Sequence, residues 1–255
     1  MLNLMRFILK IIYQLYLRVP FLGKFWRETV PKLVPQDFTL SVTVEGSKLN
    51  VLKNHWASIM LGYYEPHTLE TFKQLLSKEK TFIDIGANIG LFSSIALSSG
   101  ANVIAFEPHP RTRKILESNV VKRGAKVYPF ALSDENAEVK LFLSDEVGSH
   151  SLSLETDDYV TVKAMPLDSI ITGKVDVIKM DVEGAEIKVL KGMKNLLKNH
   201  KPDLIIEVEE EHLRRFGDTS ASLIAFLDSL GYNYQKIQEE PNYLFTDKEK
   251  TKLLK

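Results

Sequence analysis

The sequence contains no cysteine in its 255 residues. This absence excludes disulfide bonds, thiolate zinc sites and a cysteine nucleophile, and it fits a reducing compartment, so we expect a cytoplasmic protein. An excess of charge is also missing, because 33 basic residues balance 33 acidic ones. We therefore expect no nucleic-acid partner, since such partners call for a basic surface. With 44% apolar residues, the chain can bury a sizeable core in one domain.

The N-terminal segment 1–35 lacks an uninterrupted apolar run and has its own composition, with six basic residues and one acidic residue. On a helix its polar residues would form one narrow stripe (Asn3, Arg6, Lys10, Gln14 and Arg18). Lys10 and Arg18 keep each apolar run shorter than the roughly 20 residues that a membrane span needs. We expect an amphipathic helix before a domain at 36–255, with residues 1–26 lying on the cytoplasmic face of a membrane. Docking on the domain, or burial in a homodimer, is the alternative.

Strand-like and helix-like segments alternate from residue 81 onward. The strand-like segments are 81–85, 102–107, 126–132, 175–181 and 203–209, and the helix-like segments are 91–99, 110–123, 185–199 and 220–230. Such repeated units predict an α/β fold with a parallel sheet covered on both faces. Two last strands, 232–238 and 242–246, are too close together for a crossover, so we expect an antiparallel pair. Two short strands (38–46 and 48–53) and a helix (66–79) are expected to precede this region.

Residues 133–173 interrupt the alternation. Apolar and polar side chains alternate with a period of two at 138–144, 148–155 and 159–165. This pattern predicts a small antiparallel β insertion between the third and fourth strands of the sheet. Ligands of open α/β sheets bind at the carboxyl ends of the strands, and the insertion is placed to cover them.

The segment FIDIGANIG, residues 82–90, joins an apolar strand to a helix through two glycines. Glycine lets a ligand approach backbone N–H groups, and a helix N-terminus favours a negative group. The spacing Gly86-x-x-x-Gly90 differs from the Gly-x-Gly-x-x-Gly pattern of dinucleotide sites, and Asp84 would repel a pyrophosphate but attract an ammonium or sulfonium. Glu107 ends the next strand, where a carboxylate can accept both hydrogens of a ribose diol. Together these features indicate S-adenosylmethionine.

Six ordered motifs extend this pattern: FIDIGANIGLFS, AFEPHP, ALSD, PLDSI, VDVIKMDVEGAEIKVLKG and IIEVE. In this order they resemble the FkbM-type S-adenosylmethionine-dependent methyltransferases, over roughly residues 62–210. The resemblance implies a seven-stranded class I methyltransferase sheet of Rossmann-like type. It implies methyl transfer to a hydroxyl of a sugar, a glycan or another small polyhydroxylated molecule. Together with the basic, apolar N-terminal segment, this suggests a glycan or glycolipid at a membrane surface as the acceptor.

The resemblance also implies the residues around the cofactor. It places four residues at the methionine moiety (Asp84, Gly86, Asn88 and Gly90) and Glu107 at the ribose. Tyr64 and Glu65 would close over the cofactor, and Ala131 and Ser133 would flank the adenine. Relatives often have Glu-x-His after the fifth strand, whereas here Glu207 is followed by Val208 and Glu209.

A hydroxyl acceptor is helped by a base, and an imidazole titrates near neutral pH. His150 is our first candidate, Asp181 the second and His212 the reserve. Asp181 and Glu183 could instead only cap the following helix, and His150 could be an ordinary loop residue. Glu183 and Glu186 could contribute to a Mg²⁺ site, but nothing in the sequence completes it, so we expect no metal.

Two other classes of function remain open. A nicotinamide-dependent oxidoreductase could use a similar sheet, although the glycine spacing opposes it, and cofactor titration would decide between the two. A non-catalytic methyltransferase-like module at a membrane would bind the cofactor without turnover, or not at all. A nucleic-acid methyltransferase is a weaker third reading, since no basic stripe or Asn-Pro-Pro-aromatic loop accompanies the site.

Overall fold

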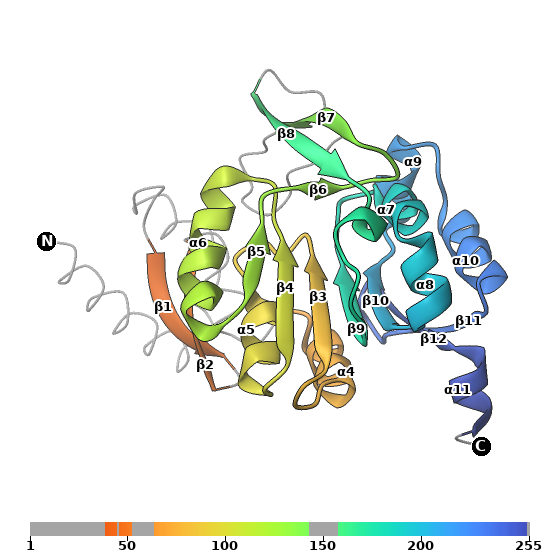
Figure 1. Cartoon of the computed structure of the whole chain (residues 1–255), viewed down its shortest axis with the longest axis horizontal. Coiled ribbons are helices and arrows are strands. Elements are labelled where there is room, and N and C mark those ends of the chain that lie inside the picture. The colour runs from red at the N-terminus through yellow and green to blue at the C-terminus, as the bar shows by residue number, and fades with distance from the viewer. Residues whose placement is uncertain (1–38, 45, 53–63, 143–157, 254–255) are drawn as a thin grey trace, which may run out of the picture.

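The computed structural model describes residues 39–44, 46–52, 64–142 and 158–253. A seven-stranded sheet forms the centre, with helices on both of its faces (Figure 1). A small three-stranded sheet lies across the end to which the parallel strands point. The N-terminal segment 1–35, and with it the proposed membrane helix, lies outside the described residues.

The main sheet has the strand order β11-β12-β10-β9-β3-β4-β5. Its strands are β3 (Thr81–Ile85), β4 (Asn102–Phe106), β5 (Lys126–Tyr128), β9 (Val177–Met180), β10 (Asp203–Glu207), β11 (Tyr232–Lys236) and β12 (Asn242–Asp247). The pairs formed by β5, β4, β3, β9 and β10 are parallel. β12 lies between β10 and β11 and runs antiparallel to both, which confirms the antiparallel pair expected at the end of the chain.

Apolar side chains of the strands alternate between the two faces of the sheet. Phe82 belongs to a core formed with α4 (Pro66–Leu75), α5 (Leu91–Ser98), α6 (Pro110–Val120) and the hairpin of β1 (Thr39–Val44) and β2 (Ser47–Leu52). Ile83 and Ile85 belong to the opposite core, formed with α7 (Glu186–Gly192), α8 (Lys194–His200), α9 (Glu210–Arg215) and α10 (Ser220–Ser229). Both faces of the sheet are therefore covered by buried apolar side chains, as the continuous apolar strands predict.

The small sheet has the order β6-β8-β7, from β6 (Ala131–Leu132), β7 (Ala137–Phe142) and β8 (Tyr159–Met165). β7 and β8 are antiparallel, as expected, whereas β6 runs parallel to β8. The short helix η4 (Leu167–Ser169) and residues 170–176 then return the chain to β9. The strand predicted at 148–155 lies outside the described residues.

Two predicted elements are each divided in two. The strand predicted at 126–132 breaks at Pro129 and Phe130, so that β5 joins the main sheet and β6 the small one. The helix predicted at 185–199 breaks at Met193, between α7 and α8. Gly192 lies just before this break, and a Cβ there would stand 1.9 Å from the Ser133 carbonyl oxygen. The break thus falls beside a residue that has a low helix propensity and packs closely against the chain after β6.

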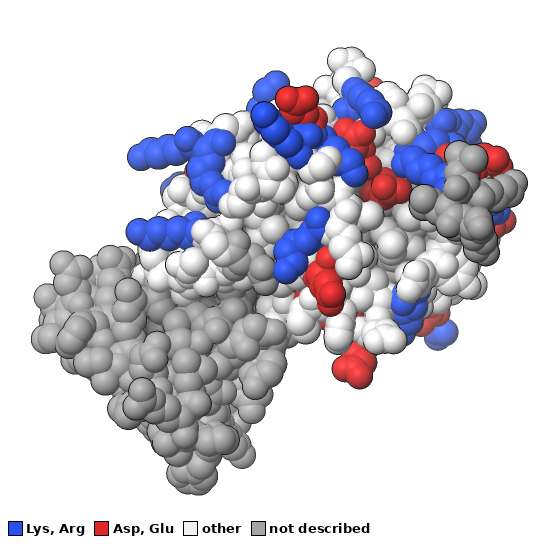
Figure 2. Space-filling view, turned by 90° about the horizontal axis from the view of Figure 1, so that it is seen from below, with Lys and Arg blue, Asp and Glu red and all other residues white. Residues whose placement is uncertain are grey.

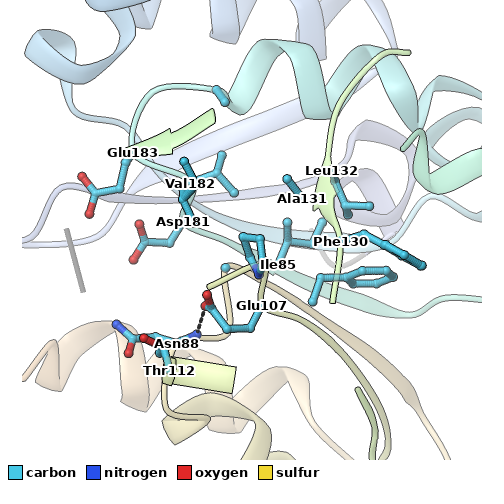
Figure 3. Close-up of a pocket in the computed structure, with 15 residues that line it drawn as sticks. Ile85, Asn88, Glu107, Thr112, Phe130, Ala131, Leu132, Asp181, Val182 and Glu183 are labelled. Carbon is cyan, nitrogen blue, oxygen red and sulfur yellow. Dashed lines mark hydrogen bonds between the residues drawn. The ribbon is translucent and has the colours of Figure 1, made fainter. Parts of the chain in front are cut away.

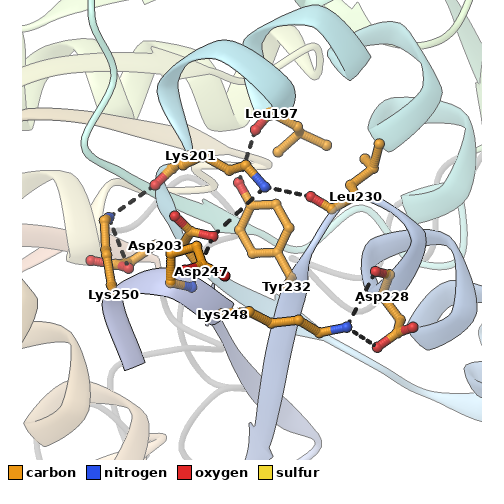
Figure 4. A network of polar contacts seen from close by, with 10 residues as sticks. Leu197, Lys201, Asp203, Asp228, Leu230, Tyr232, Asp247, Lys248 and Lys250 are labelled. Atoms are coloured by element: carbon orange, nitrogen blue, oxygen red, sulfur yellow. Dashed lines mark hydrogen bonds and ion pairs between the residues drawn. The ribbon is translucent and has the colours of Figure 1, made fainter. Parts of the chain in front are cut away.

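A polar network fastens the C-terminal helix α11 (Lys248–Leu253) to the domain (Figure 4). Lys201, in a left-handed conformation with φ 49°, donates from Nζ to the Leu230 carbonyl oxygen. Its ammonium lies 3.7 Å from Asp247 and 5.2 Å from the centre of the Tyr232 ring. Lys250 donates at 2.9 Å to the Lys201 carbonyl oxygen. The network joins α8, β11, β12 and α11.

The end of the molecule opposite the small sheet carries charges of both signs. Figure 2 shows this end from below, with lysine, arginine, aspartate and glutamate side chains interspersed among uncharged ones. Among the described residues, no helix combines the length and the apolar character that crossing a membrane requires.

Candidate functional site

Hydrogen bonds within the protein fix the conformation of the loop between β3 and α5. Asp84 is buried, and its Oδ2 accepts the backbone N–H of Ser93 at 3.1 Å and the Ser93 hydroxyl at 2.6 Å. The carboxylate thus occupies the N-terminus of α5, where a negative charge is favourable. Burial raises the pKa of Asp84 to about 6, against the lowering effect of Ser93 and Lys179.

The two glycines of this loop allow close packing. Gly86 has φ 74°, and a Cβ on it would stand 1.9 Å from the Asp181 carbonyl oxygen. Gly90 has φ 87°, and a Cβ there would stand 2.6 Å from Leu116 Cδ1 on α6. The backbone N–H groups of Gly86 and Ala87 donate to the Phe106 carbonyl oxygen. These N–H groups, which we expected to face an anion, are therefore engaged within the protein.

Glu107 follows the carboxyl end of β4 and is buried. The backbone N–H of Asn88 donates to its Oε2 at 2.9 Å, and that of His109 donates to its Oε1 at 2.8 Å. Each oxygen keeps a second acceptor position for another donor. Burial raises the pKa of Glu107 to about 7, although both N–H groups and Arg113 favour the charged form.

Glu107 lies in the middle of a cleft at the carboxyl ends of the strands (Figure 3). Figure 3 shows Asn88, Asp181 and Glu183 toward one end and Phe130 and Leu132 toward the other. The lining residues are Ile85, Gly86, Asn88, Phe106, Glu107, Pro108, Thr112, Phe130, Ala131, Leu132, Leu141, Asp181, Val182, Glu183 and Ala185. The cleft thus has an acidic end, a central carboxylate and an apolar, aromatic end.

A second hollow shares Gly86, Asn88 and Asp181 with the first. Tyr64, Asp84 and Lys179 also line it. Asn88 has φ 52°, and within the described chain its Oδ1 is buried without a hydrogen-bond partner. The junction of the two hollows therefore offers an acceptor atom to a donor from a ligand.

The acidic end contains one buried lysine. Lys179 Nζ lies 3.5 Å from Asp181 Oδ2, and Asp181, Glu65, Glu207 and Asp84 together raise the pKa of this lysine despite its burial. Burial and the nearby Asp181 raise the pKa of Glu207 to about 10. The carboxyl groups thus outnumber the lysine, and this end of the site favours a cationic ligand.

Tyr64 and Glu65 come immediately before α4. Burial and the adjacent Glu65 raise the pKa of the Tyr64 phenol. Glu65 has φ 44°, and its Oε2 accepts from Asn242 Nδ2 at 3.1 Å, which ties this segment to β12. Burial also raises the pKa of Glu65. Tyr64 therefore adds to the wall of the second hollow from a distant part of the chain, and Glu65 anchors the segment behind it.

The loop between β9 and α7 brings further acidic groups. Glu183 has φ 58°, and its Oε2 lies 3.2 Å from His212 Nδ1 on α9. Glu186 is buried, and its Oε1 accepts the backbone N–H of Gly184 at 3.1 Å. Glu186 thus stabilises the backbone of its own loop. Within the described ranges, no group of three or more histidine and carboxylate side chains is arranged to hold a metal ion.

Most of the site residues predicted from the sequence meet in these two hollows. Tyr64, Asp84, Gly86, Asn88, Glu107, Ala131 and Asp181 line one or both of them. Gly90, Glu65 and Ser133 are not among the lining residues. Ser133 donates its hydroxyl to Asp134 at 3.1 Å instead. His150 lies outside the described residues.

Sequence reasoning missed Phe130 and Lys179 and did not pair Glu183 with His212. A signal existed for Lys179, which is a single charge inside the apolar strand VIKM. Phe130 directly precedes Ala131, so the predicted adenine position already pointed to it. No local signal places Glu183 beside His212, because the contact depends on how α9 packs.

Comparisons with known proteins agree with this arrangement. The chain is 34% identical over 122 residues to the hexuronic acid methyltransferase AglP of Haloferax volcanii, covering 46% of this chain and 51% of AglP. It is 27% identical over 203 residues to the AMB antimetabolite synthetase AmbE of Pseudomonas aeruginosa, covering 61% of this chain and 9% of AmbE. The chain thus spans about half of the first relative and a small part of the second.

The fold is similar to the crystal structure of methyltransferase FkbM from Methylobacillus flagellatus. The TM-score is 0.52 at 19% identity, over 76% of this chain and 54% of that chain. Residues 84–234 match the methyltransferase FkbM domain. This match covers more than half of the sequence and includes Asp84, Glu107, Asp181 and Glu183. The chain belongs to the FkbM family of methyltransferases.

Proposed function

We propose that the protein transfers the methyl group of S-adenosylmethionine to a hydroxyl of a sugar, glycan or glycolipid. The observation that carries this proposal is Glu107, a buried carboxylate with acceptor positions left on both oxygens, in the middle of a cleft. The cleft is acidic on one side of Glu107 and apolar on the other. This order of surfaces matches the order of groups in S-adenosylmethionine.

The residues present fit the ribose, the adenine and the two cationic groups of the cofactor. Glu107 would accept the two ribose hydroxyls. Phe130, Ala131 and Leu132 would contact the adenine, whose flat apolar faces suit aromatic and aliphatic side chains. The orphaned Asn88 Oδ1 and the carboxylates near Asp181 would receive the ammonium and the sulfonium.

S-adenosylmethionine supplies an activated methyl group on a positively charged sulfur. The protein's contribution is to hold acceptor and methyl group in line and to exclude water. The small sheet supports the second task, because β6 and β7 contribute Ala131, Leu132 and Leu141 to the cleft wall. Asp181 and Glu183 lie at the end of the cleft where the methyl group would be.

Two observations support a sugar hydroxyl as the acceptor: the activity of the relative AglP and the charge of the cleft. AglP is a hexuronic acid methyltransferase, which favours a sugar-type acceptor here as well. The acidic end of the cleft, where Lys179 is paired with Asp181, suits a neutral hydroxyl better than an anionic carboxylate, since like charges repel.

Residues 1–26 remain the proposed site of contact with a membrane surface on the cytoplasmic side, which would bring the enzyme to a glycolipid. Binding of the full chain to anionic vesicles at low salt, and its loss at high salt, would support this proposal. A dimer that disappears when residues 1–29 are removed, without vesicle binding, would instead support a homodimer interface.

The proposed transfer is tested with methyl-labelled S-adenosylmethionine and a fractionated extract of the cells that produce the protein. Mass spectrometry of the labelled product should show a methyl ether on a sugar, stable to mild alkali. A label released by mild alkali would reveal an ester and contradict transfer to a hydroxyl. A protein that binds the cofactor but labels no fraction would favour the non-catalytic binding module.

A further inference from the structure

Glu183 has an unusual backbone conformation for a non-glycine residue. Its φ is 58°, and the next residue, Gly184, has φ 109°. A left-handed conformation is unfavourable for a residue with a Cβ, and such residues cluster at functional sites. The conformation turns the chain after β9 so that Glu183 lines the acidic end of the cleft, next to Asp181.

Two features of the loop hold this conformation. Glu186 Oε1 accepts the backbone N–H groups of Val182 at 3.4 Å and Gly184 at 3.1 Å. Gly184 lies against α9, where a Cβ would stand 2.3 Å from the His212 carbonyl oxygen. The missing Cβ lets α9 approach the loop and brings His212 Nδ1 to 3.2 Å from Glu183 Oε2.

His212 contacts Glu183 from outside the cleft, and this position allows it to orient the carboxylate. The histidine side chain is 27% exposed, but its Nδ1 is buried, and it does not line the cleft. Glu183 does line the cleft. The imidazole Nδ1 lies within ion-pair distance of one carboxylate oxygen, although among the described residues it makes no hydrogen bond, and the carboxylate lines the cleft where an acceptor would bind.

The charges around Glu183 come from four elements. Asp181 at the end of β9, Glu186 on α7 and Glu209 before α9 disfavour its charged form, while Arg215 on α9 favours it. Glu207 at the end of β10 also interacts with it. Burial is the largest cause, and together these raise the pKa of Glu183 to about 8. A carboxylate with such a value can take up and release a proton near neutral pH.

Asp181 is less suited to this task. Its Oδ2 is paired at 3.5 Å with the ammonium of Lys179, which is itself buried. The neighbouring Glu207 has its pKa raised to about 10, so at neutral pH it carries a proton and can donate it to Asp181. Internal partners therefore already stabilise the Asp181 carboxylate.

We propose that Glu183 is the base that removes the proton from the acceptor hydroxyl, and that His212 is the residue that positions it. This inference rests on the proposed function of the same site. In the step, the hydroxyl oxygen forms a bond to the methyl carbon while the bond from that carbon to sulfur breaks. The electron pair of the broken bond stays on sulfur, which becomes neutral, and the hydroxyl proton moves to the Glu183 carboxylate.

A first experiment needs neither cofactor nor acceptor. NMR of the full chain with ¹³C-labelled histidine follows the His212 ring as the pH rises from 5 to 10. In the wild type the ring signal should report a titration near pH 8 that comes from Glu183. Glu183→Gln should remove this step, and Glu211→Gln should leave it. Glu211 is a matched control because it lies on α9 with an 84% exposed side chain. A His212 signal with no step near pH 8 in the wild type would overturn the inference.

A second experiment measures transfer to the extract fraction that the wild type labels. Glu183→Gln should lower turnover by about 10²–10⁴-fold. Its affinity for S-adenosylmethionine should fall far less than its turnover, because Glu183 is one of several carboxyl groups near the acidic end of the cleft. Glu211→Gln should keep full turnover. Full turnover in Glu183→Gln would overturn the inference but leave the proposed function intact, whereas a wild type that does not bind S-adenosylmethionine would contradict the proposed function itself.

Discussion

Gly86 lies so close to Asp181 that a Cβ on the glycine would stand 1.9 Å from the aspartate carbonyl oxygen. The backbone N–H of Asp181 donates to the carbonyl oxygen of Ile85, the residue before Gly86, at 3.0 Å. These contacts join the carboxyl ends of β3 and β9, where both hollows of the site meet. The glycine is therefore required by the fold in addition to any role toward a cofactor.

Gly86→Ala should destabilise the protein by roughly 2–4 kcal/mol, because the added methyl group clashes with backbone and the positive φ is unfavourable. Gly46→Ala is a matched control, since Gly46 has φ 76° and nothing within 4 Å of a Cβ. It should cost only about 1–2 kcal/mol. Urea denaturation of both variants measures the difference. Equal losses would show that the contact with Asp181 is not as tight as described.

The stability of the free protein should fall as the pH rises from 5 to 8. Burial raises the pKa of Asp84 to about 6, of Glu107 and Glu186 to about 7 and of Glu183 to about 8. Their unfolded values lie near 4, so the folded state binds more protons in this window, and raising the pH favours unfolding. We expect the melting temperature to drop by about 5 °C or more.

Differential scanning fluorimetry across this pH range measures the effect. Glu186→Gln should make the fall shallower, because one of the four groups no longer titrates. A melting temperature that is constant or rises from pH 5 to pH 8 would contradict the raised pKa values.

Glu107→Gln should weaken S-adenosylmethionine binding by roughly 1.5–3 kcal/mol, the usual value of hydrogen bonds to a charged group. In the wild type the affinity should increase as the pH rises through about 7, because the ribose hydroxyls donate to the ionised carboxylate. Isothermal titration calorimetry at pH 6, 7 and 8 tests both points. Glu117→Gln, on α6 and 46% exposed, is the control that should change neither. Unchanged affinity in a folded Glu107→Gln protein would place the ribose elsewhere.

Lys201→Ala should destabilise the domain by about 1–2 kcal/mol without affecting cofactor affinity. The substitution removes the bond to the Leu230 carbonyl oxygen and the contacts with Asp247 and the Tyr232 ring. Lys198→Ala, at an exposed position of α8, should be nearly neutral. Chemical denaturation gives the stability and calorimetry the affinity. A loss of affinity in Lys201→Ala would show that the network in Figure 4 supports the site as well as the fold.

The alternation of strand and helix segments was sufficient to predict the main sheet, because continuous apolar strands and amphipathic helices are local patterns. Pro129 and Gly192 are local signals for the split of 126–132 and for the break at Met193. Where the second half of each segment packs was not predictable, since it depends on contacts between distant segments. Gly192 against Ser133 is one such contact.

The candidate site also combines positions that the sequence reveals with contacts that depend on how distant segments pack. Glu107 follows from its place at the end of a strand, a position that the sequence reveals. The pairing of Glu183 with His212 does not, because it requires α9 to pack against Gly184. Asp84 was predicted at the methionine moiety, and its hydrogen bonds to Ser93 show that it also caps α5. Whether it also contacts a cofactor stays a prediction.

The measurement that tests the central claim most directly is calorimetric titration of the full chain with S-adenosylmethionine and, separately, with NAD. The arrangement of Glu107, Asn88 and the acidic end of the cleft predicts one bound S-adenosylmethionine per chain and no detectable binding of NAD. Stoichiometric binding of NAD together with no binding of S-adenosylmethionine would contradict the account.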